Sequence, residues 1–273
     1  MYREYFRLQE EPFNITPDPR YLYMTEQHRD AMGHLLYGIR NRKGFICLTG
    51  EVGAGKTTLC RAVLHELDSD FHTALILNPM LSETQLLRSI VHEFGLESRR
   101  RDRLGYLTLL NEFLLRISSA GQDAVLIIDE AQDMTVTALE MVRLLSNLET
   151  ERQKLLQIVL VGQPELRQTL NNPALRQLAQ RITVRYHLRN MNEQETADYI
   201  RHRLKIAGQD ESDHNGVRFD FGAVKEIHRY SHGTPRLVNA LGDKALLAGY
   251  VYRTSTIDRG IVMEALKDLK EAG

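Results

Sequence analysis

The chain has 273 residues, a formal net charge of −1 at pH 7 and a hydrophobic content of 42%. That length can bury a substantial core in one large or two small domains, as expected of an ordinary soluble globular protein. The balanced charge excludes attraction of the whole molecule to nucleic acid or to an anionic membrane, although a local basic surface stays open.

Both cysteines, Cys47 and Cys60, lie where core residues are expected, so we predict buried thiols, no disulfide and a reducing cytoplasm. The amino terminus lacks the apolar stretch of a signal peptide. The longest apolar runs are far shorter than the roughly 20 residues that span a bilayer. We therefore expect a cytoplasmic chain with no direct membrane span.

The first 25 residues contain Pro12, Pro17 and Pro19, a spacing that predicts an extended lead-in rather than a helix. Two alternatives stay open for its aromatic side chains: packing on the core, or covering the adenine of a bound nucleotide. A helical apolar stripe then predicts a helix over residues 25–42.

A glycine-rich stretch follows a short apolar strand at residues 45–49 and precedes a helical pattern. It fits Gly-x-x-x-x-Gly-Lys-Ser/Thr, in which glycines let backbone N–H groups surround phosphates. Lys56 can reach the β- and γ-phosphates, and the Thr57 hydroxyl can hold Mg²⁺. The predicted nucleotide-binding residues are Gly50, Glu51, Val52, Gly53, Ala54, Gly55, Lys56, Thr57 and Thr58.

Further strands are predicted at residues 73–77, 124–128 and 155–161, separated by helices over 82–95, 104–118 and 136–148. Asp129 and Glu130 close the second of these strands. The sequence predicts that Asp129 orients Mg²⁺ and that Glu130 polarises the attacking water as general base. Gln163, at the tip of the next strand, is a candidate sensor of the γ-phosphate, or alternatively a surface-loop glutamine.

A short helix over 172–181 and a fifth strand over 182–188 complete an α/β architecture with a parallel five-stranded sheet. The alternating pattern of the fifth strand places it towards a sheet edge. After Leu188 four helices are expected: 192–208, 221–231, 235–248 and 258–269. A short polar stretch around residues 210–218 is left unassigned. We therefore predict a nucleotide-binding domain over 1–188, with residues 1–43 as lead-in and helix, and a helical lid domain over 189–273.

Motifs along the whole chain resemble those of the AAA+ ATPases, specifically the ExeA/GspA-type secretion ATPases. They are Pro12-Phe13, the lead-in around residues 16–19, Tyr37-Gly38-Ile39, the loop from Gly50 to Thr57, Asp129-Glu130-Ala131-Gln132, the segment 161–166, Gln180-Arg181-Ile182 and Gly233-Thr234-Pro235-Arg236. The resemblance implies the three-layer fold of P-loop NTPases, with ATP and Mg²⁺ bound at the interfaces of a homo-oligomeric ring or filament.

The resemblance also implies roles for single residues. Arg181 matches the arginine that acts on a neighbouring subunit's nucleotide, with Arg176 as the second candidate. Arg236 resembles the lid arginine that contacts the γ-phosphate in its own chain. Asn78, at the tip of the second strand, resembles the residue that restrains the catalytic glutamate.

We expect an ATPase that drives assembly of a cell-envelope machine for secretion, pili or polysaccharide export, through a partner at the inner membrane. The main alternative is an ATP-dependent, DNA-binding transposition regulator of the TniB/TnsC kind, for which Arg99, Arg100, Arg101 and Arg103 could supply a basic surface. A third is a nucleotide-dependent scaffold without hydrolysis. DNA is the less favoured partner because the net charge is near zero.

Overall fold

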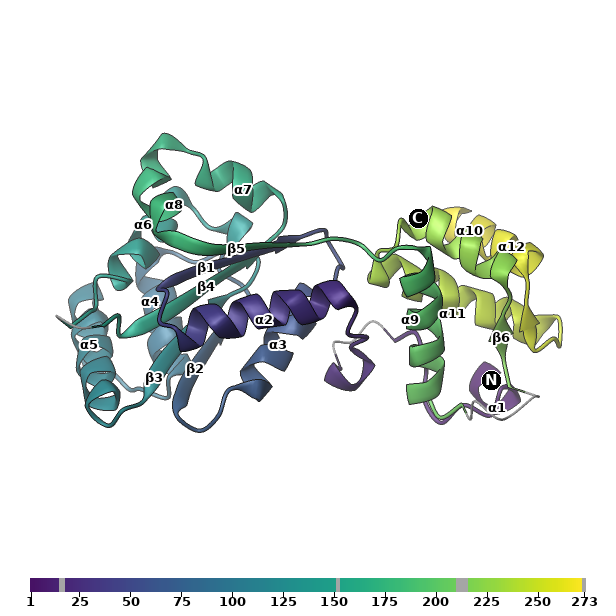
Figure 1. Ribbon diagram of the computed structural model, residues 1–273, viewed down its shortest axis with the longest axis horizontal. Helices are drawn as coiled ribbons and strands as arrows, with labels where there is room; N and C mark the ends of the chain where they lie inside the picture. Colours follow the sequence, from purple (N-terminus) through teal and green to yellow (C-terminus); the bar gives the residue numbers. More distant parts are fainter. Residues whose placement is uncertain (15–17, 151–152, 210–215, 272–273) are drawn as a thin grey trace. The chain divides into compact units, whose positions relative to one another are not determined.

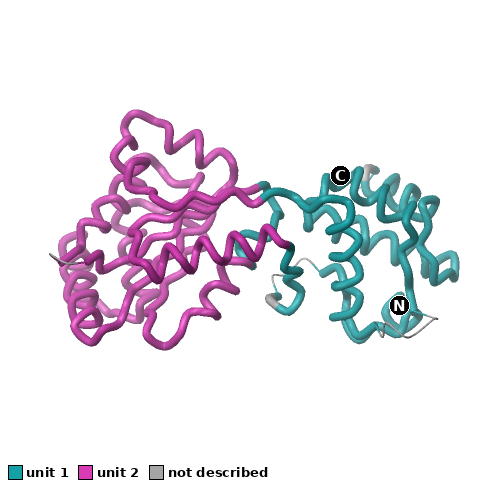
Figure 2. The backbone as a smooth tube through the Cα atoms, in the orientation of Figure 1, with its two compact units in different colours: residues 1–25, 51–58, 189–273 teal, residues 26–50, 59–188 magenta. Residues whose placement is uncertain are grey.

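The computed structural model describes residues 1–14, 18–150, 153–209 and 216–271. The chain forms two compact units, coloured separately in Figure 2. The sheet unit consists of residues 26–50 and 59–188, and the helical unit of residues 1–25, 51–58 and 189–273.

A five-stranded parallel sheet organises the sheet unit (Figure 1). Its strand order is β2-β3-β4-β1-β5, and every neighbouring pair is parallel. The strands are β1 (Phe45–Gly50), β2 (Phe71–Ile76), β3 (Asp123–Ile128), β4 (Leu156–Gly162) and β5 (Ile182–Leu188). The predicted fold class is confirmed, and β5 lies at a sheet edge as its alternating pattern indicated.

Both faces of the sheet are covered, which explains why β1 and β4 are buried along their whole length. One face forms the larger apolar cluster with side chains of the later helices of the unit. The other face packs on α2, where an added Cβ at Gly38 would lie 2.6 Å from Ile46 Cδ1. The helices are α2 (Glu26–Arg40), α3 (Lys56–Glu66), α4 (Glu83–Glu93), α5 (Arg103–Ser119), α6 (Val136–Leu145), α7 (Glu165–Leu170) and α8 (Arg176–Arg181).

Helix starts in this unit follow their capping residues. Ser82 and Gln85 form the predicted capping box of α4, and Asp102 caps α5. The predicted helix over 172–181 is a 3₁₀ turn at Pro173–Leu175 followed by α8, and α7 adds a helix that the sequence did not predict.

The helical unit contains α1 (Tyr2–Tyr5), α9 (Glu193–Ile206), α10 (Phe221–Ser231), α11 (Pro235–Val251) and α12 (Arg259–Glu271). Its four long helices are those predicted, and Asn192 with Glu195 forms the expected capping box of α9. Two short strands, for which the sequence made no assignment, are also present. β6 (Arg218–Phe219) and β7 (Thr256–Ile257) form a two-stranded parallel sheet, although two residues each are too few to give a sequence pattern.

The lead-in packs within the helical unit, whereas the sequence placed it with the sheet. Phe6, Leu8 and Phe13 are buried in the apolar cluster of that unit. It is also not wholly extended, because α1 and a 3₁₀ turn at Pro19–Tyr21 lie within it. Prolines exclude a long helix but permit a single 3₁₀ turn that starts at a proline.

A buried arginine of α9 fixes this lead-in. Arg203 is 5% exposed, and its guanidinium donates to the backbone carbonyl groups of Pro12 and Asn14, the latter at 2.7 Å. The guanidinium also lies 4.3 Å from the Tyr21 ring centroid. The aromatic side chains of the lead-in thus pack on a core, which supports the first of the two alternatives.

Candidate functional site

The predicted phosphate loop connects the end of β1 to the start of α3. Gly53 and Gly55 have φ of +77° and +91°, a region that favours glycine. Lys56 is 6% exposed, and its Nζ donates to the Glu51 carbonyl oxygen at 3.0 Å. Because α3 begins at Lys56, its amino-terminal N–H groups and the positive end of its dipole meet the loop. This arrangement can bind a chain of phosphates.

Two residues from the start of α11 lie against this loop. A Cβ added to Gly53 would lie 2.6 Å from Arg236 Cβ and 3.3 Å from Thr234 Cγ2. Thr234 is buried, whereas Arg236 is exposed. The helical unit therefore brings the predicted lid arginine to the loop, with only glycine fitting at position 53.

Other predicted residues lie at the carboxyl ends of the neighbouring parallel strands β1, β4 and β3. Thr49 pairs with Gly162, and Ile128 with Leu160, so Gln163 and Asp129 follow strands that end side by side. Asp129 is 2% exposed. Neighbouring strands are about 4.8 Å apart, so the tips of β1 and β3, with β4 between them, are separated by about 10 Å. That spacing suits a triphosphate with its cation.

A hydrogen-bonded network joins the predicted base to the predicted sensor. Gln163 Nε2 donates to Glu130 Oε2 at 3.3 Å, and Gln132 Nε2 donates to the same oxygen at 2.8 Å. The Gln163 backbone N–H donates to Gln132 Oε1 at 2.9 Å. Sequence reasoning assigned Gln132 no role beyond its place in a motif, because the contact depends on how the ends of β3 and β4 meet.

The backbone at Glu130 is left-handed, with φ 51° and ψ 38°. Such a conformation costs a non-glycine residue on the order of 1–3 kcal/mol and is typical of functional sites. Glu130 N donates to Asp129 Oδ1 at 2.9 Å, and the Glu130 carbonyl accepts from Asp133 N at 2.9 Å. These bonds hold the turn that directs the Glu130 side chain to the network.

Arg181 lies where β5 begins, at the opposite end of the strands from the carboxyl ends that place Asp129 and Gln163. It directly precedes β5, whose seven residues extend about 20 Å at roughly 3.3 Å per residue. Its Nη1 donates to Ser146 Oγ at 2.6 Å and to Asn147 Oδ1 at 2.7 Å. Arg176, the second candidate, is exposed at the start of α8. The geometry therefore separates Arg181 from the phosphate-loop edge of its own sheet.

Asn78 is exposed, and its Oδ1 accepts from Met80 N at 3.2 Å within its own turn. Two arginines of the predicted basic cluster form ion pairs: Arg100 with Asp102 at 3.1 Å and Arg103 with Glu83 at 3.0 Å. These carboxylates reduce the positive charge of the cluster.

The side chains predicted to hold a magnesium ion carry the oxygen donors that this ion prefers. Over the described residues, no group of three or more His, Cys, Asp or Glu side chains could hold a metal alone. Mg²⁺ commonly uses one or two protein oxygens together with phosphate oxygens and water. Thr57 and Asp129, which the sequence predicts as the metal ligands, each carry a side-chain oxygen of this kind.

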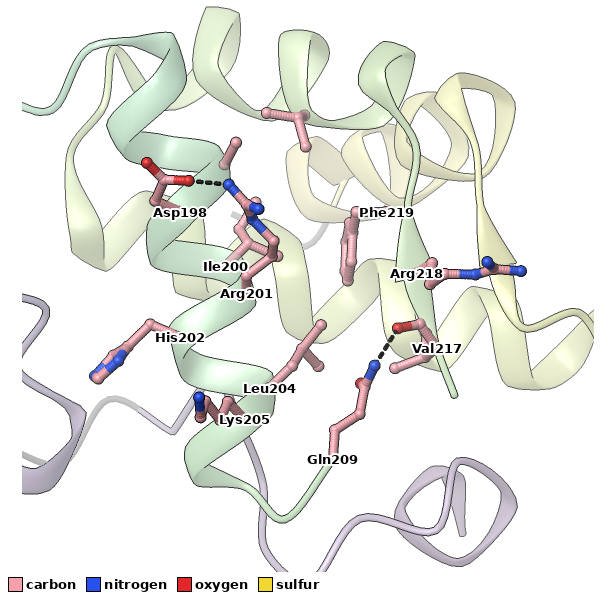
Figure 3. A pocket seen from close by; sticks show the side chains of 12 residues that line it. Asp198, Ile200, Arg201, His202, Leu204, Lys205, Gln209, Val217, Arg218 and Phe219 are labelled. Carbon is pink, nitrogen blue, oxygen red and sulfur yellow. Dashed lines mark hydrogen bonds and ion pairs between the residues drawn. The ribbon is translucent and has the colours of Figure 1, made fainter. Parts of the chain in front are cut away.

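A hollow of about 700 Å³ lies elsewhere, between α9 and β6 of the helical unit (Figure 3). Its lining combines apolar side chains, such as Leu204 and Phe219, with basic ones, such as Lys205 and Arg218. Arg201 forms an ion pair with Asp198. None of the described helices is long and apolar enough to cross a membrane.

Comparison with known proteins identifies a matching family and a related protein. Residues 39–170 match the AAA domain family. General secretion pathway protein A of Aeromonas hydrophila is 46% identical over 261 residues, which are 95% of this chain and 47% of that protein. The chain thus spans about half the length of this relative.

Solved structures share the fold at low sequence identity. Aeropyrum pernix ORC2, in ADPNP–ADP complexes, has a TM-score of 0.69 at 15% identity, covering 95% of this chain and 71% of that chain. The Drosophila ORC bound to DNA has a TM-score of 0.70 at 17% identity, with coverage of 95% of this chain and 64% of that chain. The Thermotoga maritima RuvB branch migration motor has a TM-score of 0.58 at 20% identity, with coverage of 90% of this chain and 69% of that chain.

Proposed function

The chain belongs with the AAA proteins of the general secretion pathway protein A type, and we propose that it binds ATP with Mg²⁺ and hydrolyses it. The observation that carries this proposal is the network at the strand tips. A carboxylate, Glu130, lies on a strained turn between two glutamine amides, beside the edge where the phosphate loop begins. A loop alone would support binding only, whereas a positioned carboxylate supports hydrolysis.

In the proposed reaction, Lys56 and the N–H groups at the start of α3 bind the β- and γ-phosphates. Thr57 and Asp129 would hold Mg²⁺, which would supply positive charge to the phosphate oxygens. Glu130 takes a proton from the attacking water as its oxygen bonds to the γ-phosphorus. The bond from that phosphorus to the bridging oxygen breaks, and ADP leaves. Gln163 and Arg236 contact the γ-phosphate and stabilise its charge.

We further propose that the active unit is an oligomer in which Arg181 serves the site of a neighbouring subunit. Arg181 lies at the amino-terminal ends of the strands, opposite the carboxyl ends where Glu130 lies. At that distance it is too far to act on the reaction in its own chain, which supports a role in a neighbouring one. The hydrogen bonds to Ser146 and Asn147 would hold its guanidinium in position.

The output we propose is assembly of a cell-envelope machine through a protein partner at the inner membrane. The support is the 46% identity to general secretion pathway protein A. The DNA-binding alternative gains nothing from the solved structures, because identities of 15–20% show the fold alone. Ion pairs within the arginine cluster also weaken it.

ATP turnover of the purified chain tests the enzyme activity. Lys56→Ala should abolish nucleotide binding and turnover, whereas Lys225→Ala, at an exposed position of α10, should leave both unchanged. Full turnover in Lys56→Ala would refute the site. Adding duplex DNA at two salt concentrations tests the alternative, since strong stimulation that salt removes would favour a DNA-binding regulator.

Mixing variants tests the shared site. Arg181→Ala should lose turnover while monomers still bind ATP, and Arg176→Ala should lose less. Mixing Arg181→Ala with Glu130→Gln subunits should restore part of the turnover, because some interfaces then contain both intact residues. No restoration at any ratio would show that Arg181 does not act across an interface.

A further inference from the structure

Gln132 is the member of the network to which the proposed reaction assigns no part. We infer that Gln132 is a positioning residue, which fixes the carboxylate of Glu130 so that one defined oxygen faces the attacking water. The inference rests on the proposed ATPase function and adds a residue to it.

The orientation of the Gln132 amide follows from its partners. A backbone N–H can only donate, so the group that meets Gln163 N at 2.9 Å must be the amide oxygen of Gln132. Its NH₂ group is therefore directed to Glu130 Oε2, at 2.8 Å. Gln132 thus links the backbone at the end of β4 to the carboxylate of the proposed base.

Both donors to Glu130 meet the same oxygen. Gln132 Nε2 and Gln163 Nε2 lie 2.8 Å and 3.3 Å from Oε2, so Oε1 is the oxygen that can turn to a water. The Gln132 bond is the shorter and therefore the stronger of the two. Without it the carboxylate would keep one long hydrogen bond and could rotate away from the reacting geometry.

The end of β4 is shaped to admit Gln132. A Cβ added to Gly162 would lie 2.8 Å from Gln132 Oε1 and 2.9 Å from Leu166 Cδ2. Any residue other than glycine would displace the Gln132 amide. The close approach therefore depends on Gly162, which gives an independent way to perturb Gln132 without changing its chemistry.

Asn78 was the residue that the resemblance implied as the restraint on Glu130. Its side chain is engaged with Met80 N in its own turn. Of these two amide side chains, Gln132 is the one for which the structure shows a hydrogen bond to the Glu130 carboxylate. The assignment of the positioning role to Gln132 follows from this contact.

Two substitutions of Gln132 distinguish positioning from a structural role. Gln132→Glu keeps an oxygen for the Gln163 N–H but cannot donate to Glu130, whereas Gln132→Met removes both bonds. We expect both to lower kcat about tenfold or more, the loss typical of one hydrogen bond to a charged group. The KM for ATP and the affinity for a non-hydrolysable ATP analogue should stay within about twofold of wild type. Gly162→Ala should lower kcat in the same way.

The control is Gln168→Met, an exposed glutamine of α7, which should have wild-type kcat. If Gln132 only secures the end of β4, Gln132→Glu will keep wild-type kcat while Gln132→Met loses thermal stability, and that result overturns the inference. Failure of the wild-type chain to hydrolyse ATP is a separate outcome, which would overturn the proposed function itself.

Discussion

Replacing Gly53 by alanine tests how the phosphate loop meets the start of α11. The φ of +77° is a left-handed conformation, which costs a non-glycine residue about 1–2 kcal/mol. The new methyl carbon would lie 2.6 Å from Arg236 Cβ, about 1 Å closer than carbon atoms pack. Relieving such overpacking costs about 1–3 kcal/mol. Together these terms predict a loss of about 2–5 kcal/mol in the free energy of unfolding.

Urea unfolding without nucleotide measures this loss, and an ATP analogue measures the accompanying fall in affinity. Gly33→Ala is the matched control, because nothing lies within 4 Å of an added Cβ at that position in α2. The control should be neutral or stabilising by about 0.5–1 kcal/mol, since alanine favours helices over glycine. A Gly53→Ala protein within about 0.5 kcal/mol of wild type, with unchanged affinity, would refute the described contact.

Three further predictions concern stability and reactivity. Arg203→Met should lower the free energy of unfolding by about 3 kcal/mol in urea, because it removes bonds to Pro12 and Asn14; exposed Arg201→Met should cost under about 1 kcal/mol. Burial raises the pKa of Cys47 to about 11, and Cys60 is also buried. Iodoacetamide at pH 8 should therefore label neither cysteine until the chain is unfolded, and labelling of the folded protein would contradict this. Burial lowers the pKa of His202 in the folded state. As the pH falls below about 6.5, the ordinary histidine pKa, the unfolded state therefore binds a proton before the folded state does, and the free energy of unfolding decreases. His202→Gln should reduce this acid loss between pH 7 and 5; an unchanged profile would exclude His202 as its source.

The sheet and most helices could be predicted because their signals are local. Each strand is a short apolar run between turn residues, and the capping boxes at Ser82 and Asn192 mark helix starts in the sequence alone. The phosphate loop and the acidic pair at Asp129 were equally visible, because motif spacing reflects the backbone that the chemistry needs.

Features that depend on contacts between distant segments could not be predicted. The two-residue strands β6 and β7 exist only as partners, and the left-handed backbone of Glu130 is held by neighbouring bonds, with no glycine in the sequence to indicate it. The prolines of the lead-in are visible in the sequence, but its hydrogen bond to Arg203 is not, because Arg203 lies 191 residues from Pro12. In the sequence, Gln132 is only one residue of a motif. Its hydrogen bonds to Glu130 and to the Gln163 backbone depend on how the ends of β3 and β4 meet.

Single-turnover hydrolysis of radiolabelled ATP by Glu130→Gln and by wild-type protein shows directly whether Glu130 acts as the base. The substitution keeps the side-chain size and removes the base. We expect Glu130→Gln to bind ATP as wild type does but to form little ADP. Glu112→Gln, at an exposed position of α5, should retain the wild-type rate. ADP formation by Glu130→Gln at the wild-type rate would contradict the assignment of Glu130 as the base and, with it, the reaction proposed for this site.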